Sequence, residues 1–276
     1  MDSIRVGSVT ISAVSDGIYH FDPREFFPAL SDADWALEPD ALGPAGTVDL
    51  NIGSFVVRSA GHTMLVDTGL GPHGTSPRAE SGLLPAALAA SAGLREEIDL
   101  VVATHVHPDH VGWNMTGTWP DAVPTFPNAR YLAPRLDYET GARLPEAEQP
   151  KPFREQVAPL ERLGRLGLLD GGDALTPQVW VEASPGHTAG HLCVHIASDG
   201  EYAVIVGDLT HIPAQAHRTG WGSRADVDPA QAMASRERVL DAAEAGGLLY
   251  AAGHFPAPGF GRLVRQAGRR VWKALD

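Results

Sequence analysis

The segment Thr104–His110, which reads Thr-His-Val-His-Pro-Asp-His, constrains this chain more than any other. It follows Leu100–Ala103, an apolar run of the type that forms a buried strand. Pro108 excludes a regular helix interior at this place, because proline lacks the amide hydrogen that a helix needs. The sequence therefore predicts a loop at a strand end that carries three imidazoles and one carboxylate.

An irregular loop lets neighbouring side chains point in different directions. His105 and His107 can face one centre, while Asp109 and His110 reach a second. Neutral imidazole and carboxylate are ligands that suit zinc and similar divalent ions. A chance cluster of histidines, or histidines bonded to the loop backbone, is the competing interpretation, and so dense a group disfavours it. The motif indicates a metal site, and further ligands should stand at other strand ends.

Three later strand ends each deliver one candidate ligand, namely His187, Asp208 and His254. A predicted strand precedes each of them, and glycines beside His187 permit a tight turn there. Packing alone does not readily explain three such side chains at three strand ends. The pattern therefore strengthens the prediction of a metal site.

Strands and helices alternate along the chain, and no Pro/Ser-rich linker separates two halves. The predicted strands are Gly7–Val14, Ile52–Val57, Thr63–Val66, Leu100–Ala103, Arg130–Ala133, Val179–Glu182, Leu192–Ala197, Tyr202–Val206 and, as the final strand, Leu248–Ala251. Other predicted features are a hairpin turn at Ala60–Gly61, a loop over 114–128, and helices over Leu83–Ala92, after Pro152 and from Asp228 to about Ala245. The economical interpretation is one α/β domain over residues 1–276.

The order of the motifs, His-x-His-x-Asp-His followed by His, Asp and His, resembles the metallo-β-lactamase superfamily of metal-dependent hydrolases. The resemblance runs from Leu65–Gly69 to Gly253–His254 and covers most of the chain. It implies an α/β fold, namely a four-layer αβ/βα sandwich of two mixed β-sheets with flanking helices. The site is then expected at one edge of that sandwich.

The resemblance also implies a dinuclear site. The expected ligands are His105, His107 and His187 for one ion, Asp109, His110 and His254 for the other, and Asp208 for both. A hydroxide that bridges the two ions would attack the substrate, so Asp109 and Asp208 are the expected catalytic residues. Asp67 is expected behind the ligands, where a carboxylate sets the tautomer of an imidazole. A plain aspartate in a turn is the alternative for Asp67.

Several further side chains are candidates for the pocket. His211 follows Asp208 by three residues, where the best-studied lactonases carry a tyrosine, and is expected near the substrate or an outer water. An apolar wall or ordinary core packing are the two interpretations of the aromatic residues Phe21, Phe26, Phe27, Trp113 and Trp119. Structural or surface roles are expected for His191, His195, His20, His62, His73 and His217.

The composition of the chain limits the classes of molecule that we expect it to bind. The formal charge of −13 and the lack of a basic patch disfavour nucleic acid, because its phosphates need such a patch. No apolar run is long enough to cross a bilayer, and none of signal-peptide length follows Met1. The single cysteine, Cys193, excludes an intramolecular disulfide and fits a reducing cytosol. We therefore expect a cytoplasmic monomer or homodimer that acts on a small molecule.

The branch of the family is harder to assign. Asp208 at the bridging position is similar to the N-acyl homoserine lactonase, methyl-parathion-hydrolase and glyoxalase II groups, and the long N-terminal region is similar to the first two. This implies a hydrolase of lactones or other carboxylic esters. The alternatives are a phosphotriester (organophosphate) hydrolase and a non-catalytic metal-binding protein on the same scaffold. Zinc is the expected metal, and manganese, iron or cobalt suit the same ligands.

Overall fold

Alternating apolar residues in the first part of the chain form a long antiparallel meander of β2 (Val9–Phe21), β3 (Val48–Ser59) and β4 (His62–Val66). The structure, a computed structural model, describes residues 2–72, 78–91, 93 and 95–275. The predicted turn at Ala60–Gly61 joins β3 to β4. Both of its residues have the positive φ, 51° and 82°, that a two-residue hairpin turn requires.

Within the described residues, the meander belongs to an eight-stranded mixed sheet. Its order is β1-β2-β3-β4-β6-β9-β10, and β5 pairs with β2. The remaining strands are β1 (Ser3–Val6), β5 (Ala79–Glu80), β6 (Leu100–Val102), β9 (Arg130–Pro134) and β10 (Leu166–Leu169). The pairs β4–β6, β6–β9 and β9–β10 are parallel, and the other pairs of this sheet are antiparallel.

The second half of the described chain forms a seven-stranded sheet in sequence order. Its strands are β11 (Ala174–Thr176), β12 (Val179–Ala183), β13 (Leu192–Ser198), β14 (Glu201–Ile205), β15 (Leu249–Ala251), β16 (Phe260–Gln266) and β17 (Arg269–Ala274). Only β14 and β15 are parallel among the pairs of this sheet. A small separate ribbon pairs β7 (Met115–Thr116) with β8 (Val123–Pro124).

The helices lie in the connections between strands. They are α1 (Pro23–Phe26), α2 (Asp32–Ala36), α3 (Leu84–Ser91), α4 (Pro108–Val111), α5 (Arg135–Ala142), α6 (Ala158–Arg162) and α7 (Pro229–Ala245). Shorter 3₁₀ turns cover Pro39–Ala41, Arg95–Glu97, Glu146–Glu148, Gly207–Leu209 and Pro213–Ala216, and a π-helical turn covers Phe153–Val157. The described residues include no helix that is both long and apolar enough to span a membrane.

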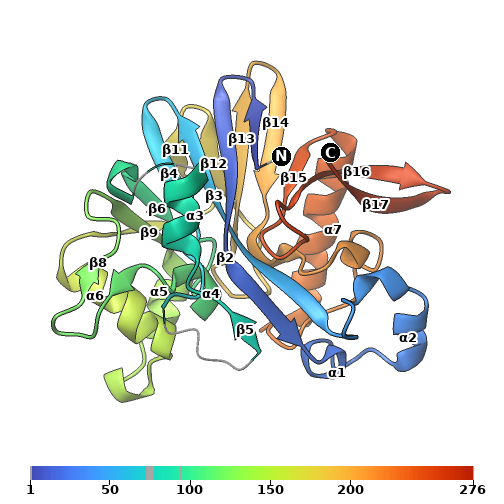
Figure 1. Cartoon of the computed structure of the whole chain (residues 1–276), viewed down its shortest axis with the longest axis horizontal. Helices are drawn as coiled ribbons and strands as arrows, with labels where there is room; N and C mark the ends of the chain where they lie inside the picture. The colour runs from blue at the N-terminus through green and yellow to red at the C-terminus, as the bar shows by residue number, and fades with distance from the viewer. Residues whose placement is uncertain (1, 73–77, 92, 94, 276) are drawn as a thin grey trace.

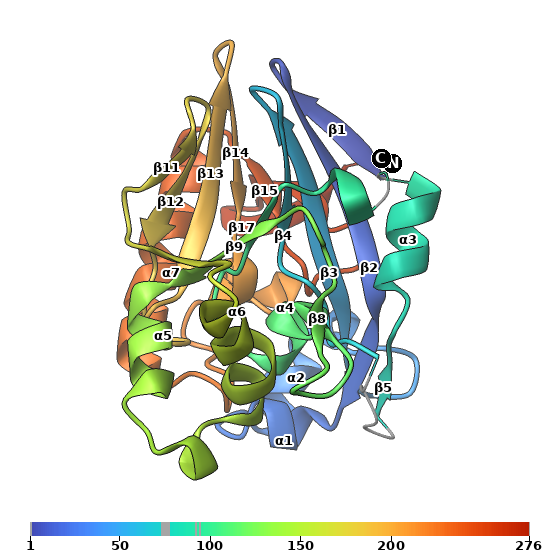
Figure 2. The same cartoon turned by 90° about the vertical axis from the view of Figure 1, so that its left-hand side faces the viewer.

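The two large sheets pack face to face, and helices cover their outer faces (Figure 2). Val66 of the first sheet and Ile205 of the second belong to the buried apolar core between them. On the outer face of the first sheet, Leu65 packs with residues of α3. On the outer face of the second sheet, Val204 packs with residues of α7. The predicted four-layer sandwich is therefore confirmed.

The topology brings four strand ends to one edge of the sandwich (Figure 1). β4 is parallel to β6 in the first sheet, and β14 is parallel to β15 in the second. Parallel neighbours end at the same side of a sheet, so the loops after them are adjacent. The loops after β6, β14 and β15 carry six of the seven candidate ligands, and the seventh, His187, lies in the loop after β12 of the second sheet.

The structure corrects two element predictions. Leu249–Ala251 is not the final strand, because the hairpin of β16 and β17 follows it. Exposed charged residues of that hairpin, such as Arg265 on β16 and Arg269 on the edge strand β17, interrupt the apolar alternation that predicts a strand. The region 114–128, predicted as a loop, contains the short strands β7 and β8.

Candidate metal centre

The motif Thr104–His110 forms the loop after β6 and the short helix α4. His107 is the N-cap of α4, and Pro108 occupies its first turn, where a helix needs no amide donor. The predicted loop thus ends at His107, and one helical turn then carries Asp109 and His110. Pro108 is therefore at the start of a short helix and not in a helix interior.

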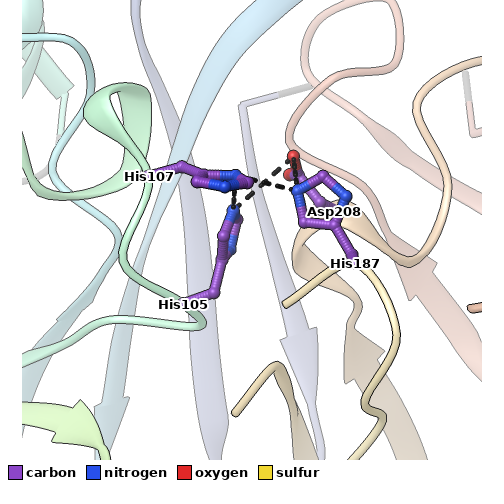
Figure 3. A group of neighbouring side chains, drawn as sticks. All are labelled: His105, His107, His187 and Asp208. Carbon is purple, nitrogen blue, oxygen red and sulfur yellow. Dashed lines mark hydrogen bonds and ion pairs between the residues drawn. The ribbon is translucent and has the colours of Figure 1, made fainter. Parts of the chain in front are cut away.

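Four side chains from both sheets gather in what we call group one: His105, His107, His187 and Asp208 (Figure 3). One donor atom from each lies within 4.8 Å of the other three. His107 Nδ1 is 3.0 Å from His105 Nε2 and 2.9 Å from His187 Nε2. A ring nitrogen offers either one hydrogen or one lone pair, so it cannot satisfy both neighbours by hydrogen bonding. A cation between the rings would accept a lone pair from each.

Three further side chains form group two: Asp109, His110 and His254. Their donor atoms also lie within 4.8 Å of one another. Asp109 Oδ2 is 3.8 Å from His110 Nε2 and 3.7 Å from His254 Nε2. The Asp109 side chain is 15 % exposed, whereas those of the two histidines are 4 % and 3 % exposed. Asp109 is therefore the member of group two that reaches solvent.

Asp208 stands between the two groups. Its Oδ2 lies 3.1 Å from His187 Nε2 and 3.7 Å from His105 Nε2. Its Oδ1 lies 3.0 Å from the Nε2 atoms of both His110 and His254. Among the described residues, neither Oδ1 nor His110 Nε2 finds a hydrogen bond of suitable geometry in spite of this short distance, and both atoms are buried. One carboxylate thus turns an oxygen towards each group.

The outer ring nitrogens of four histidines are held by oxygen atoms. The pairs are His105 Nδ1 with Thr104 Oγ1 (3.1 Å), His110 Nδ1 with Asp67 Oδ2 (2.9 Å), His187 Nδ1 with Asp226 Oδ1 (3.0 Å) and His254 Nδ1 with Asn51 O (2.8 Å). A carboxylate or carbonyl oxygen only accepts, so Nδ1 donates in the last three pairs. A neutral ring then presents the lone pair of Nε2 to the centre. This donor set could hold two divalent cations.

Burial and nearby charge act on these histidines in opposite directions. Burial lowers the pKa of His105 and of His107. Burial also acts to lower the pKa of His110 and His187, but the nearby carboxylates together outweigh it. Asp208 and Asp226 raise the pKa of His187 to about 9, and Asp208, Asp67 and Asp109 raise that of His110 well above its ordinary value. The buried carboxylates therefore attract positive charge to the centre, and divalent cations would supply it.

Asp67 lies behind the two groups, as the sequence predicts. It follows β4 and has a left-handed φ of 61°, which is strained for a residue with a side chain. Its Oδ1 accepts a hydrogen bond from Thr104 N (2.8 Å), and its Oδ2 accepts bonds from Thr104 Oγ1 (2.9 Å) and His110 Nδ1 (2.9 Å). One carboxylate therefore orients His110 and the backbone that leads into His105.

We expect Asp67→Asn to lower the affinity for divalent metal by about 10–100-fold, because the amide cannot accept all three hydrogen bonds. Calorimetric titration of metal-free protein with zinc measures this effect. Asp99→Asn is the matched control, since Asp99 also pairs with a histidine, His62, but lies at the start of β6. Equal zinc affinities for Asp67→Asn and the wild type would refute the expected role of Asp67.

An apolar wall adjoins the metal groups through His211. The His211 Nε2 atom lies 3.2 Å from Asp208 Oδ2, and the side chain is buried. The ring of Phe26 meets that of His211 edge-on, with 5.1 Å between centroids. We define the aromatic wall as five contacting side chains: Phe21, Phe26, Phe27, Trp35 and Trp221. All except the partly buried Phe21 are buried members of one apolar cluster, so these rings pack as part of the core.

The two other aromatic candidates lie elsewhere. Trp113 packs against the apolar cluster beneath α3, and its Nε1 donates to Asp16 Oδ1 at 2.9 Å. Trp119 is 42 % exposed and lies under the guanidinium of Arg162. Neither ring belongs to the aromatic wall, since Trp113 contacts Asp16 and Trp119 contacts Arg162 instead.

The remaining histidines among the described residues do not join the metal groups. His191 is buried behind Asp208, where its Nε2 accepts a hydrogen bond from Asp208 N at 3.0 Å. His195 stacks on Trp180 within the second sheet. Carboxylate partners at the periphery are Asp49 for His20, Asp99 for His62 and Glu38 for His217. His73 lies outside the described residues.

Sequence reasoning missed three buried residues around group one. Asp226 accepts the hydrogen bond of His187 Nδ1, and Arg236 of α7 lies 3.5 Å from Asp226. Asp137 of α5 accepts three hydrogen bonds from the two loops that carry the histidines of group one. No motif or spacing marks these residues, because each reaches the centre only through the packing of α5 or α7.

Comparison with known proteins gives one family. The family model of the metallo-beta-lactamase superfamily matches residues 49–254. No curated protein matches the chain. The match includes every candidate metal ligand and Asp67.

Several solved structures are similar to this chain. AidC, a dizinc quorum-quenching lactonase, is 23% identical with a TM-score of 0.84, over 99% of this chain and 97% of that chain. The hydrolase AbOPH of the beta-lactamase superfamily is 26% identical with a TM-score of 0.85, over 99% and 97% of the two chains. A probable metal-dependent hydrolase from Staphylococcus aureus is 19% identical with a TM-score of 0.82, over 99% of each chain. Because the family match alone spans about three quarters of the sequence, the chain belongs to the metallo-beta-lactamase superfamily of metal-dependent hydrolases.

Proposed function

We propose that this chain, as a single domain, binds two divalent cations, with zinc favoured, and hydrolyses a lactone or another carboxylic ester. The observation that carries the proposal is the position of Asp208. Its two oxygens face group one at 3.1 Å and group two at 3.0 Å. A carboxylate that is shared in this way suits a pair of cations close together.

Each part of the site has a separate task in this proposal. When bound, the two cations supply a Lewis acid and a water molecule of lowered pKa. Water adds to the carbonyl carbon, the carbon–oxygen bond of the ester breaks, and a proton passes to the leaving oxygen. The proton that the water releases passes by way of the Asp109 carboxylate to that oxygen. We assign this relay to Asp109, since it is the carboxylate of the two groups that is open to solvent, 15 % exposed against 5 % for Asp208. Asp67 and Asp226 keep the Nδ1 atoms of His110 and His187 protonated, so that both Nε2 atoms face inwards.

The aromatic wall supports an apolar acyl group as part of the substrate. It begins at Phe26 beside His211, and so lies next to the centre where the carbonyl group would react. A similar structure, 17% identical with a TM-score of 0.67 over 91% of this chain and 94% of that chain, is an N-acyl homoserine lactone hydrolase with the product N-hexanoyl-L-homoserine bound at its catalytic metal centre. An acyl lactone would place its ring at the cations and its chain along the wall.

A substrate panel on protein of measured metal content tests the proposal. The panel contains acyl lactones, unstrained carboxylic esters and aryl phosphotriesters. We expect two bound ions and the highest kcat/KM for acyl lactones. A higher kcat/KM for phosphotriesters than for lactones would show that phosphotriesters are the substrate class. Fewer than two bound ions would refute the dinuclear centre.

The Phe26→Ala variant tests the wall. We expect it to raise KM for an acyl lactone by about tenfold and to leave KM for a lactone without an acyl chain unchanged, because only the acyl chain meets the ring. Trp119→Ala is the matched control, since it removes an aromatic ring that lies outside the wall. Equal changes for both lactones would show that Phe26 acts on the fold and not on the acyl group.

A further inference from the structure

A buried carboxylate on α5 connects the two loops that carry the histidines of group one. Asp137 Oδ2 accepts hydrogen bonds from Val106 N at 3.1 Å and from Thr188 Oγ1 at 2.8 Å. Asp137 Oδ1 accepts a third from Gly190 N at 2.7 Å. Val106 stands between His105 and His107, whereas Thr188 follows His187 directly.

The topology explains how a residue of α5 reaches this place. β9 runs parallel to β6, so the two strands end at the same edge of the first sheet. Asp137 lies three residues beyond the end of β9 and therefore beside the loop that follows β6. Thr188 and Gly190 come from the second sheet, in the loop between β12 and β13. The carboxylate thus spans the junction between the two sheets.

Two features indicate that the contact is specific. Two of the three partners are backbone amides that only donate and cannot rotate, and one faces each carboxylate oxygen, so both oxygens of Asp137 have to accept. Position 190 also requires glycine, because a Cβ atom there would lie 2.8 Å from both the backbone nitrogen and Oδ1 of Asp137. The side chain of Asp137 has little contact with solvent, as the residue is 8 % exposed. An unpaired donor at this depth would be costly.

We propose that Asp137 is a positioning residue that sets the distance between the His105–His107 loop and His187, and so controls the affinity of group one for its cation. The inference rests on the proposed two-cation centre. Asp137 has no hydrogen bond to a residue of group two among the described residues. Group two is held by other contacts, such as Asn51 Nδ2 to Gly253 O (2.7 Å) next to His254. The two cations should therefore respond differently to loss of this carboxylate.

The test compares zinc binding by metal-free wild type and by Asp137→Asn, with calorimetric titration and measured metal content. We expect two ions on the wild type. In Asp137→Asn, one ion should bind about 10–100-fold more weakly, while the affinity of the other stays within about threefold. Gly190→Ala should give the same selective loss, because it displaces the carboxylate without removing it. Asn51→Ala should instead weaken the other ion.

Two controls separate positioning from a general loss of structure. Glu139→Gln removes a different carboxylate from the same helix, where Glu139 pairs with Arg143, and should leave both affinities unchanged. Amide hydrogen exchange of the metal-free protein measures the protection of the two amides that donate to Asp137, those of Val106 and Gly190. Exchange at Val106 and Gly190 should be faster in Asp137→Asn than in the wild type, whereas exchange in strands remote from these loops, such as β16, should be unchanged.

The outcomes distinguish this inference from the proposed function. If the wild type binds two ions and Asp137→Asn binds both with unchanged affinity, the inference is wrong and the dinuclear centre stands. Equal weakening of both ions would also overturn it, because that result means a general loosening. If the wild type binds fewer than two ions, the proposed function fails, and this inference fails with it.

Discussion

Replacing Asp208 with alanine is expected to lower kcat/KM for the preferred ester by about a thousandfold, which corresponds to roughly 4 kcal/mol of transition-state stabilisation. Asp208 is the side chain whose two oxygens face His187 on one side and His110 and His254 on the other. In the proposed two-cation centre, each cation would lose a ligand without this side chain. Steady-state kinetics on protein of measured metal content gives the result.

The control for this variant is Asp121→Ala, which removes an exposed aspartate from the loop between β7 and β8. Its kinetics and metal content should equal those of the wild type. An Asp208→Ala protein that keeps two ions and loses less than tenfold in kcat/KM would contradict the bridging role. Loss of both ions with an unchanged melting temperature would support it, because the defect would then be local.

The Arg236→Met variant is expected to lower the free energy of unfolding by about 3–5 kcal/mol, because it leaves a buried carboxylate without its cation. The Arg236 side chain is 1 % exposed, and its Nη2 lies 3.5 Å from Oδ2 of the fully buried Asp226. Its Nε donates to Leu209 O and its Nη1 to Thr219 O, both at 2.7 Å. Methionine fills a similar volume but provides none of these donors. Denaturant unfolding of the metal-free proteins measures the difference.

Arg238→Met is the matched control on the same helix. The Arg238 side chain is 50 % exposed, and its ion pair with Glu182 lies at the surface. Exposed ion pairs contribute little, so we expect a loss of about 1 kcal/mol or less. If Arg236→Met and Arg238→Met lose equal stability, the buried guanidinium does not stabilise the loops of Asp208 and Asp226.

Local sequence patterns predict many of the strands and helices and the order of the candidate ligands along the chain. The strand before His105 was predicted from an apolar run, and the N-terminus of α7 from Asp228 followed by Pro229. Both patterns depend on residues that are neighbours in sequence, so they can be recognised without the tertiary structure. The hairpin of β16 and β17 could not be predicted from the sequence, because its exposed residues are charged and do not alternate regularly with apolar ones.

The surroundings of the candidate ligands could not be predicted in the same way. Asp137 and Asp226 each meet a loop that is distant in sequence, Asp226 being 39 residues from His187. Trp113 stands close to the motif in sequence, yet it packs beneath α3 and not in the aromatic wall. Such contacts depend on how sheets and helices pack, which leaves no local pattern to detect.

The amino-acid sequence by itself determined which chemical groups stand at the strand ends and in what order, and this order led to the family. Only the tertiary structure decided that Asp208 turns one oxygen to each group and that Phe26 meets His211. The reason is physical. The type of a side chain and its place after a strand are local properties, whereas His107 and His187, 80 residues apart, meet because two sheets pack with their strand ends at one edge.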